Sequence, residues 1–229
     1  MTDSVLVFDQ HRPRLYAIAY RMLGAVAEAE DVVQEAWLRW HGADRAAIQN
    51  AEAWLVTATT RLAIDRLRAA KAERAGYVGV WLPEPMLMAA PSTPEQIHEM
   101  ADDVSVAFLF MLESLSPDAR AAFLMREVFD ADYEDIAFTL EKTQAACRQL
   151  VMRAKRQLRQ GTPRQAVPRA TLRRLLLAFA DAMQRSDFNG LHALLSDDAE
   201  LIGDGGDKVT AFASLVGGKR LAQLFYAGK

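Results

Sequence analysis

The sequence predicts a mainly helical protein, with two helical domains followed by a C-terminal segment that mixes helices and strands. Apolar residues recur with helical spacing over residues 5–74 and again over residues 95–160. Prolines and glycines cluster over residues 75–94 and 161–168, which indicates two linkers. From Ala199 onward the apolar residues form short runs between turn residues, which is typical of strands.

Charge is unevenly distributed along the 229 residues, although the net charge is only −3. Residues 83–141 contain thirteen acidic and two basic residues, whereas residues 142–180 contain ten Lys and Arg and no acid. Such segregation favours one surface for a polyanion and other surfaces for protein partners. Half of the residues are apolar, which is enough to bury real cores.

The first block contains an amphipathic helix at residues 27–40, AEAEDVVQEAWLRW. Its apolar face consists of Val32, Val33, Ala36, Trp37 and Trp40. Its acidic face carries the candidate binding residues Glu30, Asp31, Gln34 and Glu35. The plain alternative is an ordinary surface helix with a solvated polar face.

A second helix of this block, at residues 53–68, combines core positions with a basic flank. Threonines at positions 57, 59 and 60 are poor helix formers, so another role is expected, such as bonding phosphates or unpaired bases. The candidate nucleic-acid contacts of this helix are Thr57, Thr60, Arg61, Asp65, Arg66 and Arg68.

The second block ends in a helix-turn-helix pattern over residues 133–159. Thr143 is expected to cap the second helix, in which Cys147, Leu150, Val151, Ala154 and Leu158 form one apolar stripe. The other face carries residue types that reach base edges and phosphates. The candidate contacts are Thr143, Gln144, Arg148, Gln149, Arg153, Lys155 and Arg156.

The third block, residues 169–229, begins with a helix predicted over Leu172–Gln184. Its core stripe is expected to be Leu172, Leu175, Leu176, Phe179 and Met183. A turn at Asp187–Gly190, a helix to Leu195 and a short strand at Ala199–Ile202 should follow. The sequence DGGDKV then predicts a turn, and Thr210–Val216 is expected to be extended or irregular.

Several site classes are not expected. A lone cysteine, Cys147, excludes an intrachain disulfide and a multi-cysteine metal site, and the four histidines form no metal or catalytic constellation. We therefore predict no cofactor and no metal. The chain starts without a secretory leader and has no apolar run of about 18 residues, so a cytoplasmic, soluble protein with no membrane partner is expected.

Together, the motifs EDVVQEAWL, WLVTATTRLAIDRLR and the helix-turn-helix ending RAKRQL resemble a bacterial sigma factor of the small extracytoplasmic-function class. This resemblance covers roughly residues 5–160. It implies sigma region 2 at residues 5–74, a linker at residues 75–94, and sigma region 4 at residues 95–160. The protein is then expected to be a promoter-specificity factor and not an enzyme.

The resemblance also assigns partners to the candidate residues. The acidic residues Glu30, Asp31, Gln34 and Glu35 resemble the surface that binds the core RNA polymerase through its β′ subunit, with the β subunit as a further contact. The basic helix of the first block resembles the reader of the −10 promoter element. The helix-turn-helix resembles the reader of the −35 element, with Arg148 as a specificity residue and Lys155 as a phosphate anchor.

Two further segments resemble hallmarks of the subgroup with a fused SnoaL-like domain. One is WLPEP in the linker, which comprises Trp81, Leu82, Pro83, Glu84 and Pro85. The other is DGGDKV, which comprises Asp204, Gly205, Gly206, Asp207, Lys208 and Val209. In this subgroup the extension regulates the sigma factor in cis. Residues 169–229 are too few for a complete SnoaL-like α+β domain, so a truncated one is expected, with an unknown ligand or protein as its partner.

The chain departs from the family pattern at three positions. Arg61 stands where Asn is more common, Glu141 stands where the turn of the helix-turn-helix usually has Gly, and Asp207 replaces a Gly of the C-terminal motif.

Two alternatives remain open from the residues alone. The chain could be a one-component helix-turn-helix regulator with a ligand-sensing tail, although this leaves the first block unexplained. A weaker alternative is an enzymatic tail that uses His192, Asp197, Asp198 or Asp204 as a general base.

Overall fold

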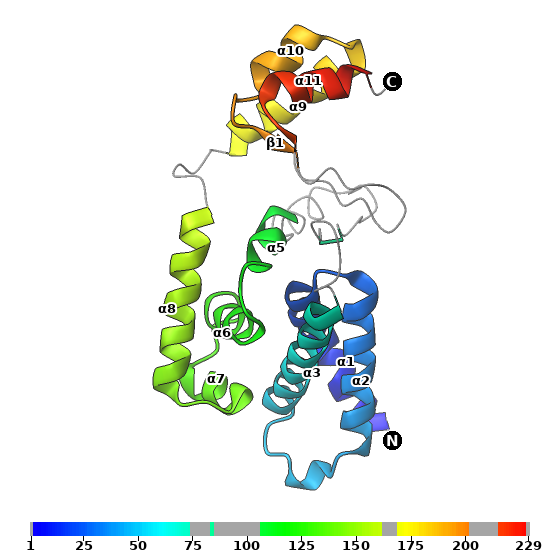
Figure 1. The fold of residues 1–229 in the computed structure, drawn as a ribbon. Coiled ribbons are helices and arrows are strands. Elements are labelled where there is room, and N and C mark those ends of the chain that lie inside the picture. The colour runs from blue at the N-terminus through cyan, green and yellow to red at the C-terminus, as the bar shows by residue number, and fades with distance from the viewer. Residues whose placement is uncertain (1, 74–82, 85–105, 162–168, 202–214, 228–229) are drawn as a thin grey trace. The chain divides into compact units, whose positions relative to one another are not determined.

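The computed structural model describes residues 2–73, 83–84, 106–161, 169–201 and 215–227. The chain forms two compact units. The first unit contains both helical blocks, and the second contains the C-terminal segment. Figure 1 shows the order of the elements within each unit. Among the described residues, no helix is both long enough and apolar enough to cross a membrane.

The first block forms the helices α1 (Thr2–Leu23), α2 (Val26–Gly42) and α3 (Ala51–Glu73), with a short 3-10 turn η1 (Arg45–Ala47) before α3. Side chains such as Leu15, Met22, Leu55 and Leu67 are fully buried between these helices. Burial of each such side chain stabilises the fold by roughly 2 kcal/mol. The ring nitrogen of Trp40 also donates to the Ser4 carbonyl at 3.0 Å, which fixes α2 against α1.

The second block forms α5 (Val106–Leu112), α6 (Pro117–Glu127), α7 (Tyr133–Leu140) and α8 (Gln144–Gly161). Side-chain caps explain where two of these helices begin. The Ser116 hydroxyl accepts from the Ala119 amide at 3.3 Å, and the Asp132 carboxylate accepts from the amides of Glu134 and Asp135 at 2.9 and 2.8 Å.

The two blocks share one hydrophobic core, which continues from α1–α3 to Leu109, Leu124 and Leu158. A buried arginine crosses this junction: Arg120 of α6 donates to the Met22 carbonyl of α1 at 2.6 Å. It also pairs with Glu113 at 2.9 Å, so its charge is compensated. The two blocks therefore pack as one body, in which α3 lies against α6 and α7.

The second unit contains α9 (Arg169–Arg185), α10 (Phe188–Leu194), α11 (Gly218–Ala227) and two strands, β1 (Glu200–Leu201) and β2 (Leu215–Val216). The strands pair in antiparallel register, Glu200 with Val216 and Leu201 with Leu215. The rings of Phe179 and Phe225 meet edge to face at 5.6 Å beside a small core of Ala182, Leu191 and Ala222. Within the described residues this is a small α+β unit; a SnoaL-like cone is not evident in it.

Two expectations for the C-terminal segment need correction, and one helix was missed. The predicted turn at Asp187–Gly190 is instead the start of α10, because the Asp187 carboxylate caps the helix through the Gly190 amide at 2.9 Å. Leu175, predicted in the core stripe, is 42% exposed. Helix α11 was not predicted at all, since the sequence pattern after Val216 is short and contains two adjacent glycines. The side chains of Leu172 and Leu176 lie outside the described residues.

Candidate nucleic-acid interface

The acidic face of α2 lies beside an apolar groove. Glu30, Asp31, Gln34 and Glu35 are all exposed, as predicted for a binding surface. A groove of about 840 Å³ runs along α1 and α2, and its lining includes Phe8, Val33, Trp37, Glu30 and Gln34. Burial, followed by the charges of Glu30 and Glu84, raises the pKa of Tyr16, which also lines the groove. An apolar floor beside carboxylates suits a protein partner.

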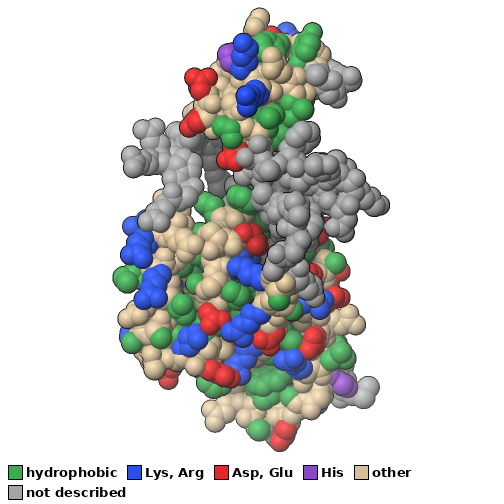
Figure 2. All heavy atoms as spheres, viewed as in Figure 1, with side chains coloured by type: hydrophobic (Ala, Val, Ile, Leu, Met, Phe, Trp, Pro, Cys, Tyr) green, Lys and Arg blue, Asp and Glu red, His purple; other side chains and the backbone are tan. Residues whose placement is uncertain are grey.

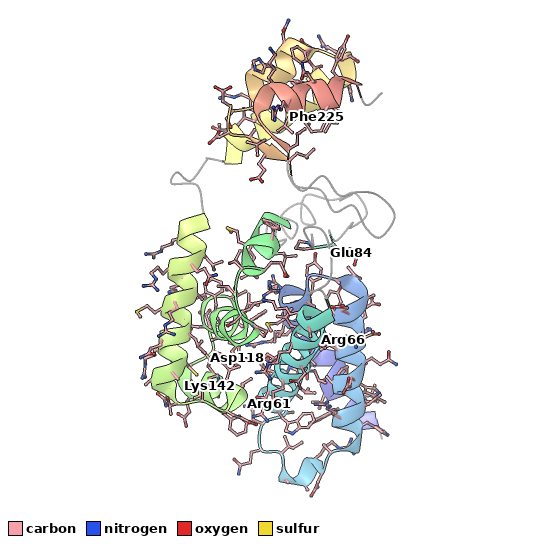
Figure 3. The ribbon with its side chains drawn as sticks, in the orientation of Figure 1. Arg61, Arg66, Glu84, Asp118, Lys142 and Phe225 are labelled. Carbon is pink, nitrogen blue, oxygen red and sulfur yellow. The ribbon has the colours of Figure 1, made fainter. Side chains whose placement is uncertain are left out.

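Two of the acidic residues already have basic neighbours. Asp31 pairs with Arg66 of α3 at 3.0 Å, and Glu35 pairs with Arg39 one turn later at 2.8 Å. Figure 3 labels Arg66 on α3. These pairs are exposed, so each contributes little to stability and leaves the carboxylates available for another partner.

Helix α3 is the helix predicted to contact nucleic acid. Side chains on its basic side contact the helix-turn-helix instead. Arg61 donates from Nε to the Thr139 carbonyl at 2.9 Å and from Nη2 to the Phe138 carbonyl at 2.8 Å. Its guanidinium also lies 3.2 Å from the Glu141 carboxylate. One turn earlier, the hydroxyls of Thr57 and Thr139 are hydrogen-bonded at 3.1 Å. We call Thr57, Arg61 and Arg68 the α3 face.

Arg68 joins the same contact through a carboxylate on α6. Asp118 accepts from Arg68 at 2.7 Å and from Lys142 at 3.1 Å, so one acid connects α3 with the turn of the helix-turn-helix (Figure 3). Burial alone raises the pKa of Asp118, but the hydrogen bonds and charges of Lys142 and Arg68 outweigh it. The pKa therefore lies below its ordinary value, and the carboxylate stays ionised at neutral pH.

The other candidates on α3 are placed differently. Thr60 is only 1% exposed, so its hydroxyl faces the interior in this structure. Asp65 is exposed and lies 3.4 Å from Arg68, while Arg66 pairs with Asp31. Hence, of the six candidates on α3, the three residues of the α3 face contact the second block directly.

Helix α8 lies where the second helix of the helix-turn-helix was predicted. The Thr143 hydroxyl accepts from the Ala146 amide at 3.2 Å, which confirms the predicted cap. Of the predicted apolar stripe, Cys147, Val151, Ala154 and Leu158 are buried and Leu150 is half-buried. Burial raises the pKa of the Cys147 thiol, so it is a packed core residue as predicted.

The opposite side of α8 is open to solvent. Its exposed polar residues include Gln144, Arg148, Gln149, Arg153 and Arg156, which we call the recognition face. Figure 2 shows basic side chains along the edge of the first unit where α8 lies, and interleaved basic and acidic side chains elsewhere on the same face. Lys155, the predicted phosphate anchor, is half-buried and pairs with Glu127 at 2.6 Å.

Tyr133 was not predicted as a functional residue, yet its ring lies under Arg148 of the recognition face. The guanidinium carbons of Arg148 and Arg126 lie 5.0 and 5.1 Å from its ring centroid. Arg148 also donates to the Gln144 side chain at 3.1 Å. The one signal for this role in the sequence was an aromatic residue directly after the capping Asp132. Which arginines stack on that ring cannot be derived from spacing alone.

Only part of the predicted linker site can be placed. Trp81, Leu82, Pro85 and residues 204–209 lie outside the described residues. Glu84 caps α2: its carboxylate accepts from the Val26 amide at 3.0 Å, and its own amide donates to the Gly24 carbonyl at 2.7 Å. Gly24 has a positive φ of 74°, and a Cβ added there would lie 3.3 Å from the Pro83 side chain. These two linker residues therefore belong structurally to the first block.

The alternative of an enzymatic tail gains no support from its candidate residues. His192 is exposed and stacks on Phe188 at 6.1 Å, and Asp197 and Asp198 are also exposed. Asp204 lies outside the described residues. Across the described part of the chain, no group of three or more His, Cys, Asp or Glu is arranged to hold a metal ion.

Comparisons with known proteins account for both helical blocks. The family models "Sigma-70 region 2" and "Sigma-70, region 4" match residues 7–73 and 105–158. The first match explains the block that a one-component regulator would leave unexplained.

Comparisons that span most of this chain extend these similarities beyond the two blocks. The chain is 36% identical to the ECF RNA polymerase sigma factor SigJ of Mycobacterium tuberculosis, over 98% of this chain and 72% of SigJ. It is 32% identical to the probable ECF sigma factor SigI of the same species, over 81% of this chain and 64% of SigI. The crystal structure of the extracytoplasmic function sigma factor SigJ matches with a TM-score of 0.74 and 32% identity, over 96% of this chain and 73% of that one.

Proposed function

We propose that this chain, which belongs to the extracytoplasmic-function RNA polymerase sigma factors, binds core polymerase through the acidic face of α2 and contacts promoter DNA through α3 and α8. Sigma factors of this family partner core RNA polymerase and promoter DNA, and they are not enzymes. They act by recognising DNA and polymerase, so their function depends on binding free energy and not on catalysis. Because that polymerase is cytoplasmic, we also propose a cytoplasmic location.

The exposed acidic face beside the apolar groove is the observation that carries the polymerase contact. The groove offers apolar area for the centre of an interface, and the carboxylates offer charge for its rim. We propose that a basic helical element of the polymerase β′ subunit occupies it, with the β subunit as a further contact.

Charge reversal on α2 tests this proposal. The double variant Asp31→Lys/Glu35→Lys should lose binding to core polymerase in a pull-down without DNA, while circular dichroism shows the helices intact. The matched control, Asp197→Lys/Asp198→Lys, changes the same number of exposed charges in the second unit and should bind normally. Wild-type affinity of the α2 variant would contradict the proposal.

For the −10 element, α3 supplies the basic and hydroxyl groups that hold separated strands. Capture of an unpaired base costs a few kcal/mol of stacking and pairing, which phosphate and pocket contacts must offset. Arg61 and Arg68 provide the charge, and Thr57 provides a hydroxyl beside them. In the described structure these groups contact α6 and α7 instead.

For the −35 element, the recognition face of α8 supplies the base and phosphate contacts. Side chains in the first half of a recognition helix meet base edges in the major groove, which favours Gln144, Arg148 and Gln149. The later residues Arg153, Lys155 and Arg156 are better suited to phosphates. The exposure of this face and its lack of acidic side chains support the assignment.

We further propose that the C-terminal segment is a SnoaL-like extension that regulates the sigma factor in cis. The resemblance of the WLPEP and DGGDKV motifs supports this, as does the anchoring of Pro83 and Glu84 on the turn between α1 and α2. Truncation after Gln160 should change promoter output and increase protease cleavage near Trp81. Unchanged transcription together with unchanged cleavage would show that the segment is passive.

A further inference from the structure

We propose that Glu84 of the linker is a positioning residue for the polymerase-binding helix: it caps α2 from outside that helix, so that docking of the linker and binding of core polymerase stabilise one another. The cap is a property of the free chain, and its effect on polymerase rests on the proposed role of α2. Figure 3 labels Glu84 at the end of the first block where α2 begins. Glu84 lies 58 positions after Val26, whose amide it binds, so the contact depends on the tertiary fold.

Helix α2 has no side-chain cap of its own. The first amides of an α-helix have no intrahelical acceptor, and Ser, Thr, Asp or Asn at the N-cap position usually supplies one. In α2 this position is Ala25, which makes no side-chain cap. Its backbone is nevertheless that of an N-cap residue, with φ −130° and ψ 134°. The sequence directly before α2 therefore leaves the first turn without an acceptor.

The carboxylate of Glu84 supplies the missing acceptor. Its Oε2 accepts from the Val26 amide at 3.0 Å, at the first residue of α2. A negative charge at this end of a helix also interacts favourably with the helix dipole. The hydrogen bond and the charge of Glu84 therefore both favour an ordered first turn in α2.

The turn between α1 and α2 holds the backbone of Glu84 in place. The Glu84 amide donates to the Gly24 carbonyl at 2.7 Å, and the Glu84 carbonyl accepts from the Tyr20 hydroxyl at 2.8 Å. Tyr20 is only 2% exposed, so its hydroxyl is fixed by the core. A Cβ on Gly24 would lie 3.3 Å from the Pro83 side chain, so glycine permits this close approach. Together with the cap, Glu84 is bound at three points.

The cap lies beside the proposed polymerase groove. Glu30 follows Val26 by one helical turn and lines the groove together with Tyr16. The charge of Glu84 reaches this groove, because it contributes, after burial and the charge of Glu30, to the raised pKa of Tyr16. The other candidate polymerase residues follow on the same helix. If the first turn of α2 frays, polymerase must order it on binding, and the affinity falls.

The coupling between linker and polymerase must act in both directions. If the docked linker raises the affinity of α2 for polymerase, bound polymerase must hold the linker more tightly by the same factor. A residue that only stabilised the fold would show no such effect at the linker. A residue that contacted polymerase directly could not be replaced by a local cap on α2. These two differences define the experiments.

The first experiment measures the affinity of the full chain for core polymerase without DNA. Glu84→Ala should weaken binding by about three- to tenfold, which corresponds to the loss of one helix cap. Glu84→Gln keeps an acceptor without its charge and should have an intermediate affinity. Ala25→Ser supplies an acceptor within the N-cap itself, so the double variant Glu84→Ala/Ala25→Ser should return to within about twofold of the wild type.

A matched cap in the same block separates this effect from general stability. Asn50 caps α3, because its side chain accepts from the Ala53 amide at 3.0 Å. Asn50→Ala therefore removes a comparable hydrogen bond away from the groove and should change core affinity by less than about twofold. An equal loss in Asn50→Ala and Glu84→Ala would overturn the proposal, as would wild-type affinity of Glu84→Ala. Failure of Ala25→Ser to rescue would overturn the capping role.

The second experiment follows amide hydrogen exchange by mass spectrometry, with and without core polymerase. In the free chain, Glu84→Ala should speed exchange in the first turn of α2 by about three- to tenfold, and Ala25→Ser should reverse this. Addition of core polymerase to the wild type should slow exchange of the Glu84 amide, and unchanged exchange there would overturn the coupling. If the wild type binds no core polymerase, the proposed function fails, and exchange in the free chain still decides whether Glu84 caps α2.

Discussion

The α3 face and the recognition face of α8 are both arginine-bearing surfaces, but the structure treats them in opposite ways. Arg61 and Arg68 of the α3 face bind carbonyls and a carboxylate of the second block. Arg148 and Arg153 of the recognition face are exposed, and Arg148 is supported from within its own helix-turn-helix. One face is covered by the chain and the other is ready for a ligand.

This difference suggests an order of events. A face that is already exposed and preorganised can engage DNA without rearrangement, whereas the covered face must first exchange its intramolecular partners for DNA. With the proposed roles, we predict that the −35 contacts are available in the free chain and that the −10 contacts require the α3 face to leave the second block. Both faces carry arginines, so the difference between them comes from their positions in the tertiary structure.

The largest expected effect comes from Arg120, the buried arginine between the two blocks. Arg120→Ala leaves Glu113 and the Met22 carbonyl without this partner at the junction of the two blocks. We expect a loss of about 3 kcal/mol in the free energy of unfolding, measured by urea denaturation. The exposed Arg153→Ala should change it by less than about 0.5 kcal/mol. If Arg120→Ala and Arg153→Ala changed the free energy of unfolding by similar amounts, the contrast between a covered and an open surface would be wrong.

Arg148 should define sequence preference at the open face. Arg148→Ala is expected to cost ~1–3 kcal/mol at one base position of the −35 element and to relax the preference there. Lys155→Ala is the matched comparison, and it should weaken all sequences alike and reduce the salt slope by about one unit. Binding measured across a promoter panel at several salt concentrations separates the two. Identical profiles would contradict the proposed division between base and phosphate contacts.

A smaller effect should follow from the ring that supports Arg148. Tyr133→Leu removes the stacking surface, and we expect a loss of about 0.5–1 kcal/mol in −35 binding. Tyr133→Phe keeps the ring and should bind close to the wild type. The comparison excludes the hydroxyl as the cause. Equal losses in both variants would instead indicate that the hydroxyl contacts DNA directly.

The smallest expected effect is a pH dependence of the covered face. Because the pKa of Asp118 is lowered in the folded chain, its contribution is fully present above the unfolded pKa of about 3.9 and is lost as pH falls through the folded value. The contribution of Asp118 to the free energy of unfolding, measured by urea denaturation, should thus be constant from about pH 7 to about pH 5 and should fall below about pH 4. Asp118→Asn should flatten that acidic fall, and an unchanged profile would exclude Asp118 as the titrating group.

Local features of this protein followed from its sequence. The cap at Thr143 and the buried stripe with Cys147 are both present. Each depends on residues within a few positions of one another, so spacing and residue type are sufficient. The family resemblance likewise rests on short motifs in a fixed order.

Tertiary structure alone decided which of these residues are available. Arg61 binds carbonyls 77 and 78 residues away, Thr60 turns into the core, and Glu84 caps a helix that begins 58 residues earlier. Such pairings depend on how the shared core places α3 against α7 and the linker against Gly24. No local pattern encodes them, because side chains distant in sequence meet only after the helices have packed.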